Sequence, residues 1–206
     1  FLPLTAAGLK DAEVHLSVEG HLQRDPSLLA ELIPRNEAMW GLAWHSLTPA
    51  GKEEIDALVG LTVAAPSGYV TRATLIQACQ QLHAEKGTQE LIAVLTSLLH
   101  RGLAVAKTTG ASLAPFVSWA SVAGHLGDSA LDSEAVAEYL ASTPCTPADP
   151  LAPQILAVKS MARGSFAQLA MLITGGREVT DASRESLTIR HGYSAGLTYT
   201  ELRAVA

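Results

Sequence analysis

Hydrophobic residues along most of this chain recur every three or four positions, the spacing that places them on one face of an α-helix. The pattern is densest between residues 91 and 103, where hydrophobic side chains cover most of a helical cylinder. These positions are Leu91, Ile92, Leu95, Leu98, Leu99 and Leu103. We expect this stretch to be the central and most buried helix.

Helix starts are marked by residues that cap a first turn. Asp25–Pro26 and Thr48–Pro49 each join an N-cap side chain to a proline at the first helical position. Further N-caps are expected at Asn36, Thr71 and Thr88, and helix ends at Gly60, Gly87 and Gly175–Gly176. Helices are also expected over 113–122, 134–141 and, as one long helix, from Pro153 to Gly175. The pattern therefore predicts an all-α fold.

One segment near the N-terminus fits two structures. From Val14 to Leu22 apolar and polar residues alternate, which favours a strand. The charged residues Lys10, Asp11 and Glu13 before it are compatible with a helix. We therefore expect all helices, with one minor strand or hairpin near the N-terminus as the alternative for this segment.

A proline-rich stretch interrupts the helical pattern at residues 143–153, which contain four prolines. Proline lacks the N–H that a helix needs, so this stretch is predicted to be an extended linker. It would separate a helical body, residues 1–142, from a C-terminal helical piece, residues 154–206. A piece of this size is near the lower limit for folding alone, so we expect it to dock on the body or on a neighbouring subunit.

The composition is unusually poor in charge: 17% of residues are charged and 48% are hydrophobic, against about 25% charged in typical globular domains. A surface with so little charge suits a subunit that neighbouring copies cover. We therefore expect a homo-oligomer or polymer, with an ordinary alanine-rich domain as the alternative.

The two cysteines, Cys79 and Cys145, are too few for a disulfide framework and too far apart for a metal knuckle. A reducing, intracellular location or an assembled particle is expected, without a metal or other cofactor. No run of about 18 uncharged apolar residues occurs, so no membrane span is expected.

Catalytic motifs are lacking in the sequence. Gly192–Gly196 reads G-x-S-x-G, the pattern of a serine nucleophile turn, but only ten residues follow it, without a histidine or an aspartate. HExxH, P-loop, GxGxxG and CxxC motifs are absent. No catalytic residue is predicted, and a non-enzymatic role is favoured.

Three groups of residues are candidates for binding. Trp40, Trp44 and His45 form an aromatic cluster, expected at a packed interface or as a stacking platform for a ligand or nucleobase. His100–Arg101 interrupts the most apolar helix and faces either an anion-binding groove or solvent. The basic residues predicted to contact nucleic acid, or to pair with acidic neighbours instead, are Lys159, Arg163, Arg177, Arg184, Arg190 and His191.

Together these features predict a non-enzymatic, self-assembling structural subunit of the coat or nucleocapsid type, whose C-terminal arginines contact nucleic acid. One alternative is a helical enzyme or small-ligand binder with an apolar pocket near His45 and His100. Another is a protein-interaction adaptor that uses a helix-turn-helix-like segment at residues 71–103.

Overall fold

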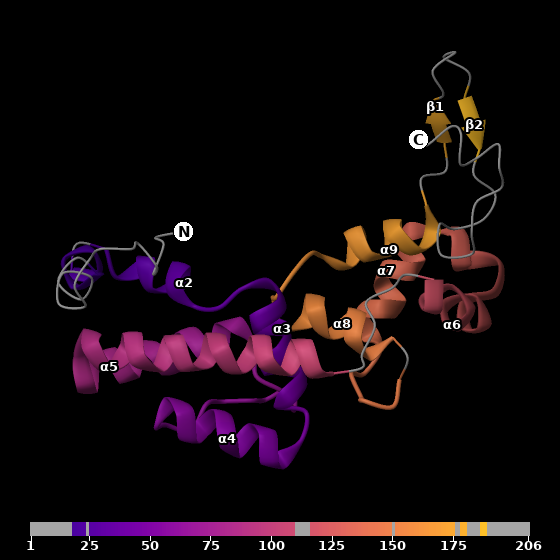
Figure 1. Ribbon diagram of the computed structural model, residues 1–206. Coiled ribbons are helices and arrows are strands. Elements are labelled where there is room, and N and C mark those ends of the chain that lie inside the picture. The colour runs from indigo at the N-terminus through magenta and orange to yellow at the C-terminus, as the bar shows by residue number, and fades with distance from the viewer. Residues whose placement is uncertain are drawn as a thin grey trace. The chain divides into compact units, whose positions relative to one another are not determined.

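The fold is all-α with one small hairpin, in agreement with the class that the sequence predicts (Figure 1). The computed structural model describes residues 18–23, 25–109, 116–149, 151–175, 178–180 and 186–188. Residues 18–23 are helical. The later helices are η1 (Pro26–Leu28), α2 (Leu29–Leu32), α3 (Asn36–His45), α4 (Pro49–Val59), α5 (Arg72–Thr108), α6 (Phe116–Leu126), η2 (Gly127–Leu131), α7 (Ser133–Ser142), α8 (Ala152–Lys159) and α9 (Phe166–Thr174). Strands β1 (Glu178–Thr180) and β2 (Ser186–Thr188) pair antiparallel.

The chain divides into two compact units. The first consists of Phe1–Thr109 and Lys159–Arg163, and the second of Gly110–Val158 and Gly164–Ala206. This division differs from the one expected from the sequence, because it follows the end of α5 rather than the proline-rich stretch. The chain also returns briefly to the first unit after α8.

The first unit is built on a close crossing of α3 and α5. A Cβ added at Gly41 would overlap the carbonyl oxygen of Gly102, and one added at Gly102 would overlap that of Ala38. Glycine at both positions therefore allows the two helix backbones to touch. Large side chains fill the surrounding core, and Met39, Leu42, Leu75, Leu82, Leu91 and Leu98 are fully buried. Figure 1 shows α4 running beside α5 in this unit.

Helix α5 begins with a capping box between Thr71 and Thr74. At Gly87 the backbone has a φ of 81°, so two helical segments follow one another and the predicted helix end is confirmed. Thr88 is buried, and its hydroxyl lies 3.0 Å from His83 Nε2.

Among the described residues, α5 is also the one helix that is long and apolar enough to cross a membrane. One third of its most apolar window (33%) is buried inside the protein. The core helix of a soluble protein passes the same test, so length and composition alone do not make α5 a membrane span.

The segment Lys159–Arg163 completes the first unit by capping two of its helices. The Asn36 N–H donates to the Ala162 carbonyl at 3.2 Å, and the Arg72 N–H donates to the Ser160 carbonyl at 2.9 Å. These N–H groups open α3 and α5 and have no partner within their own helices. The expected side-chain cap at Asn36 is wrong: Arg35 holds the N-cap position of α3 and makes no side-chain cap bond.

The second unit includes the end of the proline-rich stretch in its core, whereas Pro144 and residues 146–148 are exposed. Leu151 and Ile155 are fully buried against a cluster formed by α7 and α9, which includes Val136, Leu140, Ala170 and Ile173. The Cys145 thiol lies 3.5 Å from the Ala152 carbonyl oxygen. Residues of the expected linker therefore pack as part of this unit.

The single helix expected from Pro153 to Gly175 is wrong, because a turn separates α8 from α9. Met161 has a φ of 61° there, outside the helical region. Ser165 then starts α9 with a capping box in which Gln168 is the partner. Lys159 and Arg163, which that single helix would have contained, lie at the end of α8 and in this turn.

The ambiguous N-terminal segment is helical where the structure describes it. Residues 18–23 form a helix, in which Val18 and Leu22 are buried one turn apart. Residues 14–17 lie outside the described part of the chain. The hairpin occurs near the C-terminus instead.

Candidate functional site

A polar hollow of about 340 Å³ opens on the first unit, where α3 ends, α4 begins and the last turns of α5 pass. We call it the polar hollow. Its lining residues are Trp44, His45, Thr48, Arg101, Val105, Thr108 and Thr109.

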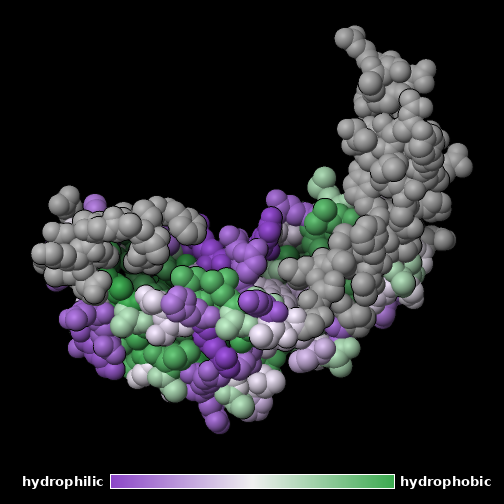
Figure 2. All heavy atoms as spheres, in the orientation of Figure 1, coloured by the Kyte–Doolittle hydropathy of each residue, from purple (hydrophilic) through white to green (hydrophobic). Residues whose placement is uncertain are grey.

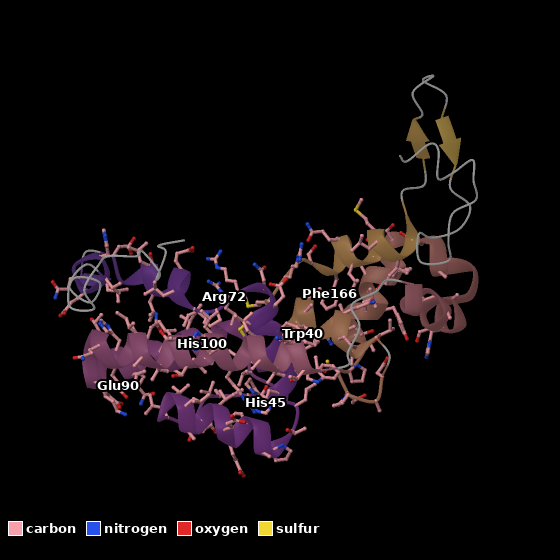
Figure 3. The ribbon with its side chains drawn as sticks, in the orientation of Figure 1. Trp40, His45, Arg72, Glu90, His100 and Phe166 are labelled. Carbon is pink, nitrogen blue, oxygen red and sulfur yellow. The ribbon has the colours of Figure 1, made fainter. Side chains whose placement is uncertain are left out.

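The crossing of α3 and α5 positions two of these residues. His45 follows Gly41 by one helical turn and Arg101 precedes Gly102 directly, so the contact between the two glycines brings both side chains to one place. Figure 3 shows His45 beside α4 and His100 along α5.

Helix α4 brings a carboxylate to the same place. Thr48 caps α4 by accepting from the Gly51 N–H at 3.2 Å, and Pro49 occupies the first turn. A Cβ at Gly51 would overlap the His45 carbonyl oxygen, so glycine lets α4 pack against the end of α3. One turn further along α4, Glu54 reaches His45 and Arg101.

The three charged or ionisable side chains meet at one oxygen atom. Glu54 Oε2 lies 2.7 Å from His45 Nε2 and 2.6 Å from Arg101 Nη2, and the two nitrogens lie 3.2 Å apart. An ionised carboxylate only accepts, so Nε2 donates to Glu54 and cannot also accept from Arg101. Glu54 therefore holds both donors on the same atom.

The pKa of the Glu54 carboxyl is below its ordinary value. The hydrogen bond from His45 is the largest cause, burial acts in the opposite direction, and Arg101 adds a further hydrogen bond and its charge. Glu54 is thus held as an anion, and with Arg101 it forms a charge-balanced pair.

An aromatic pair adjoins this cluster. The rings of Trp40 and Trp44 stack with centroids 5.5 Å apart and an angle of 21° between their planes. Trp40 is buried in the core, whereas Trp44 is half-buried and lines the polar hollow. The hollow therefore offers an indole and a guanidinium together.

The structure thus brings together Trp40, Trp44, His45 and Arg101, which the sequence singled out in two separate groups. His100 is exposed and does not line the polar hollow. Glu54 was not predicted. In the sequence, Glu54 is marked only by its position about one turn into a helix with a strong N-cap. Such a position does not identify the residues that its side chain contacts.

The basic residues predicted to bind nucleic acid are only partly described. Lys159 and Arg163 belong to the segment that caps α3 and α5, and Arg163 Nη1 lies 4.0 Å from Glu37 Oε1. Arg177, Arg184, Arg190 and His191 lie outside the described residues, as does Gly192–Gly196. Their nucleic-acid contacts stay a prediction.

The described part of the chain has no candidate metal site, and one of its two cysteine thiols is fully buried. It holds no group of three or more histidine, cysteine, aspartate or glutamate side chains that could bind a metal ion. Burial raises the pKa of the Cys79 thiol to about 12, so this thiol stays protonated and unreactive at neutral pH.

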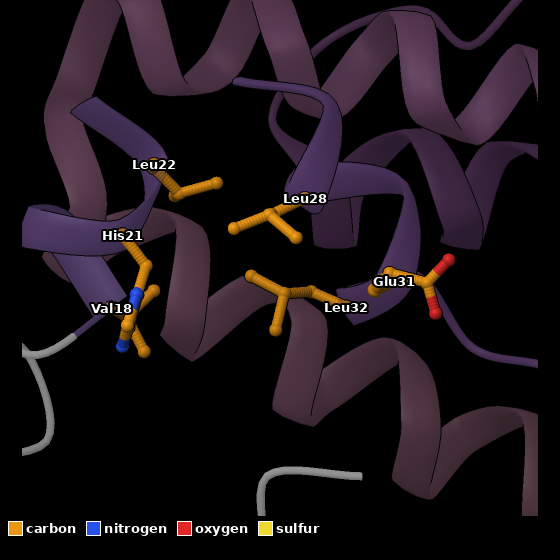
Figure 4. Close-up of a pocket in the computed structure, with 6 residues that line it drawn as sticks. All are labelled: Val18, His21, Leu22, Leu28, Glu31 and Leu32. Atoms are coloured by element: carbon orange, nitrogen blue, oxygen red, sulfur yellow. The ribbon is translucent and has the colours of Figure 1, made fainter. Parts of the chain in front are cut away.

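A second hollow of about 310 Å³ lies elsewhere in the first unit (Figure 4). We call it the apolar hollow. Val18, Leu22, Leu28 and Leu32 form most of its wall, and His21 and Glu31 stand at its edge without bonding each other. Within the described residues no set of polar groups converges there.

Comparison with protein families, with curated proteins and with solved structures finds no match to this chain.

Proposed function

We propose that this protein is a non-catalytic helical binding subunit, and that its polar hollow takes one nucleotide unit of a single-stranded nucleic acid. The observation that supports this proposal is that Trp44 and Arg101 line the same hollow. An aromatic ring stacks on a base of any sequence, and a guanidinium pairs with the phosphate beside it.

The size and openness of the polar hollow favour a segment of a polymer. At about 340 Å³ it is at the small end of ligand sites. It is an open depression rather than an enclosed cavity, so a strand could enter it from solvent. Such a site would hold one unit weakly, and affinity would come from many units along a strand.

The hydrogen bonds of the hollow favour binding over catalysis. His45 is bonded to Glu54 rather than to a hydroxyl. The Thr48 hydroxyl donates to the His45 carbonyl, and the Thr108 hydroxyl donates to the Ala104 carbonyl at 2.8 Å. Among the described residues of the hollow, no nucleophile is therefore paired with a base.

The direct experiment is a binding titration with fluorescein-labelled hexauridylate, followed by fluorescence anisotropy. Arg101→Gln is expected to weaken binding roughly tenfold at low salt, because it removes one phosphate contact. Arg35→Gln is the matched control, because Arg35 is in the same unit, is exposed and pairs with Glu31 at 2.7 Å. Thermal melting of each variant confirms that it is folded.

Two outcomes would contradict the proposal. Equal weakening in Arg101→Gln and Arg35→Gln would show that only the total charge matters. Absence of binding by the wild-type protein at low salt, where phosphate contacts are strongest, would exclude the nucleic acid altogether.

Self-assembly is a second candidate function, favoured by a hydrophobic surface on α9. Met171 and Leu172 are 57% and 54% exposed and adjacent in sequence, and Figure 2 shows hydrophobic residues at the surface of this helix. Sedimentation velocity over a range of concentrations would test it. Assembly that is lost in Leu172→Gln but kept in Leu103→Gln, a change at another exposed leucine, would support it. A monodisperse monomer at high concentration would contradict it.

A further inference from the structure

Glu54 occupies the place where an anionic ligand of the polar hollow would bind. Its Oε2 atom takes hydrogen bonds from both Arg101 and His45, at 2.6 and 2.7 Å. A phosphate oxygen would use the same two donors, because guanidinium and imidazole N–H groups bind phosphate and carboxylate alike.

We propose that Glu54 is an internal competitor for the nucleic-acid phosphate, so that a strand binds in the polar hollow only by displacing this carboxylate from Arg101 and His45. This inference rests on the proposed function and names the way in which the same site is regulated.

The exposure of the three side chains is consistent with displacement. The Glu54 side chain is 42% exposed, that of Arg101 is 36% exposed and that of His45 is 20% exposed. Glu54 lies on α4 and bonds to two of the residues that line the hollow, His45 and Arg101. Rotation of its side chain toward solvent would uncover both donors without a movement of the helix.

Among the charged groups nearby, Glu54 is the one that would determine whether a phosphate can reach Arg101 and His45. On α4 itself, Lys52 and Asp56 pair with each other at 2.5 Å. Glu53, the neighbour of Glu54, is exposed. With Arg101 paired to Glu54, an entering phosphate finds both donors occupied and is repelled by the Glu54 carboxylate.

The test compares Glu54→Gln with Glu53→Gln in the hexauridylate titration at neutral pH and low salt. Glutamine keeps the shape of the side chain and removes the charge that competes. We expect Glu54→Gln to bind roughly tenfold tighter than the wild-type protein, from the loss of one like charge a few ångströms from the phosphate. Glu53→Gln makes the same change in net charge one residue away and should tighten binding less than twofold.

The outcomes separate this inference from the function on which it rests. If the wild-type protein binds, and Arg101→Gln weakens binding, but Glu54→Gln binds equally or more weakly, then Glu54 is not a competitor and the proposed function stands. Equal tightening in both glutamine variants also overturns the inference, because it would reflect net charge alone. If the wild-type protein does not bind, the proposed function fails, and the inference that rests on it fails with it.

Discussion

The polar and apolar hollows of the first unit have similar volumes, about 340 and 310 Å³, but very different linings. At the polar hollow, His45 from α3 and Arg101 from α5 both bond to one carboxylate oxygen of Glu54, which lies on α4. In the apolar hollow, His21 and Glu31 stand apart at the rim of a wall of aliphatic side chains. Volume alone therefore does not distinguish the two hollows, whereas the convergence of groups from separate helices does.

The largest effect is expected from adding a side chain where α3 and α5 touch. In Gly102→Ala, the new Cβ would overlap the Ala38 carbonyl oxygen, and a backbone atom cannot move aside without shifting its helix. We expect a loss of about 3 kcal/mol in the free energy of unfolding and loss of the polar hollow. Urea denaturation measures the first and the hexauridylate titration the second.

Gly124→Ala is the matched control for that change. Gly124 lies within α6, and a Cβ there meets nothing within 4 Å. Alanine should therefore stabilise the helix by about 0.5–1 kcal/mol. If both substitutions stabilise the protein, the close crossing of α3 and α5 is not a feature of the native state.

A smaller effect is expected from a substitution in the wall of the apolar hollow. Leu22 is 4% exposed, and Leu22→Ala should lower the free energy of unfolding by about 2 kcal/mol through lost packing. The affinity for hexauridylate should not change under conditions where the variant is folded. A weakened affinity would mean that the two hollows act together, which would break the contrast between them.

The smallest effect is the acid dependence of the cluster at Glu54. Because the pKa of Glu54 is lowered on folding, its stabilisation is present above the ordinary glutamate pKa and is lost as the pH falls through the lowered value. The half-exposed side chain limits this to less than about 1 kcal/mol. The melting temperatures of the wild-type protein and Glu54→Gln should differ at neutral pH and converge in strong acid. A difference that persists in acid would contradict the sign.

Local signals in the sequence predicted the fold class and several helix boundaries. Thr48 and Thr71 cap helices as expected, and Gly87 interrupts α5. The break between α8 and α9 was missed because the apolar residues on both sides keep a helical spacing. The capping box from Ser165 to Gln168 was present, but the continuous hydrophobic stripe around it favoured one helix.

The sequence singled out two parts of the site separately but did not show that they come together. The spacing within α3 grouped Trp44 with His45, and the interruption of the apolar stripe singled out Arg101. Joining them required the contact between Gly41 and Gly102, which depends on residues 61 positions apart in the sequence. Glu54 could not be found because its neighbour Glu53 carries the same charge, and only the packing of α4 distinguishes the two.

The most direct test of the central claim is a titration of the ¹⁵N-labelled protein with hexauridylate, followed by two-dimensional NMR. We expect the largest shifts at the Trp44 indole N–H and at the backbone amides of residues 44–48 and 101–109, with little change around Leu22 and Leu28. Shifts centred on the apolar hollow, or shifts spread evenly over the surface, would contradict the account.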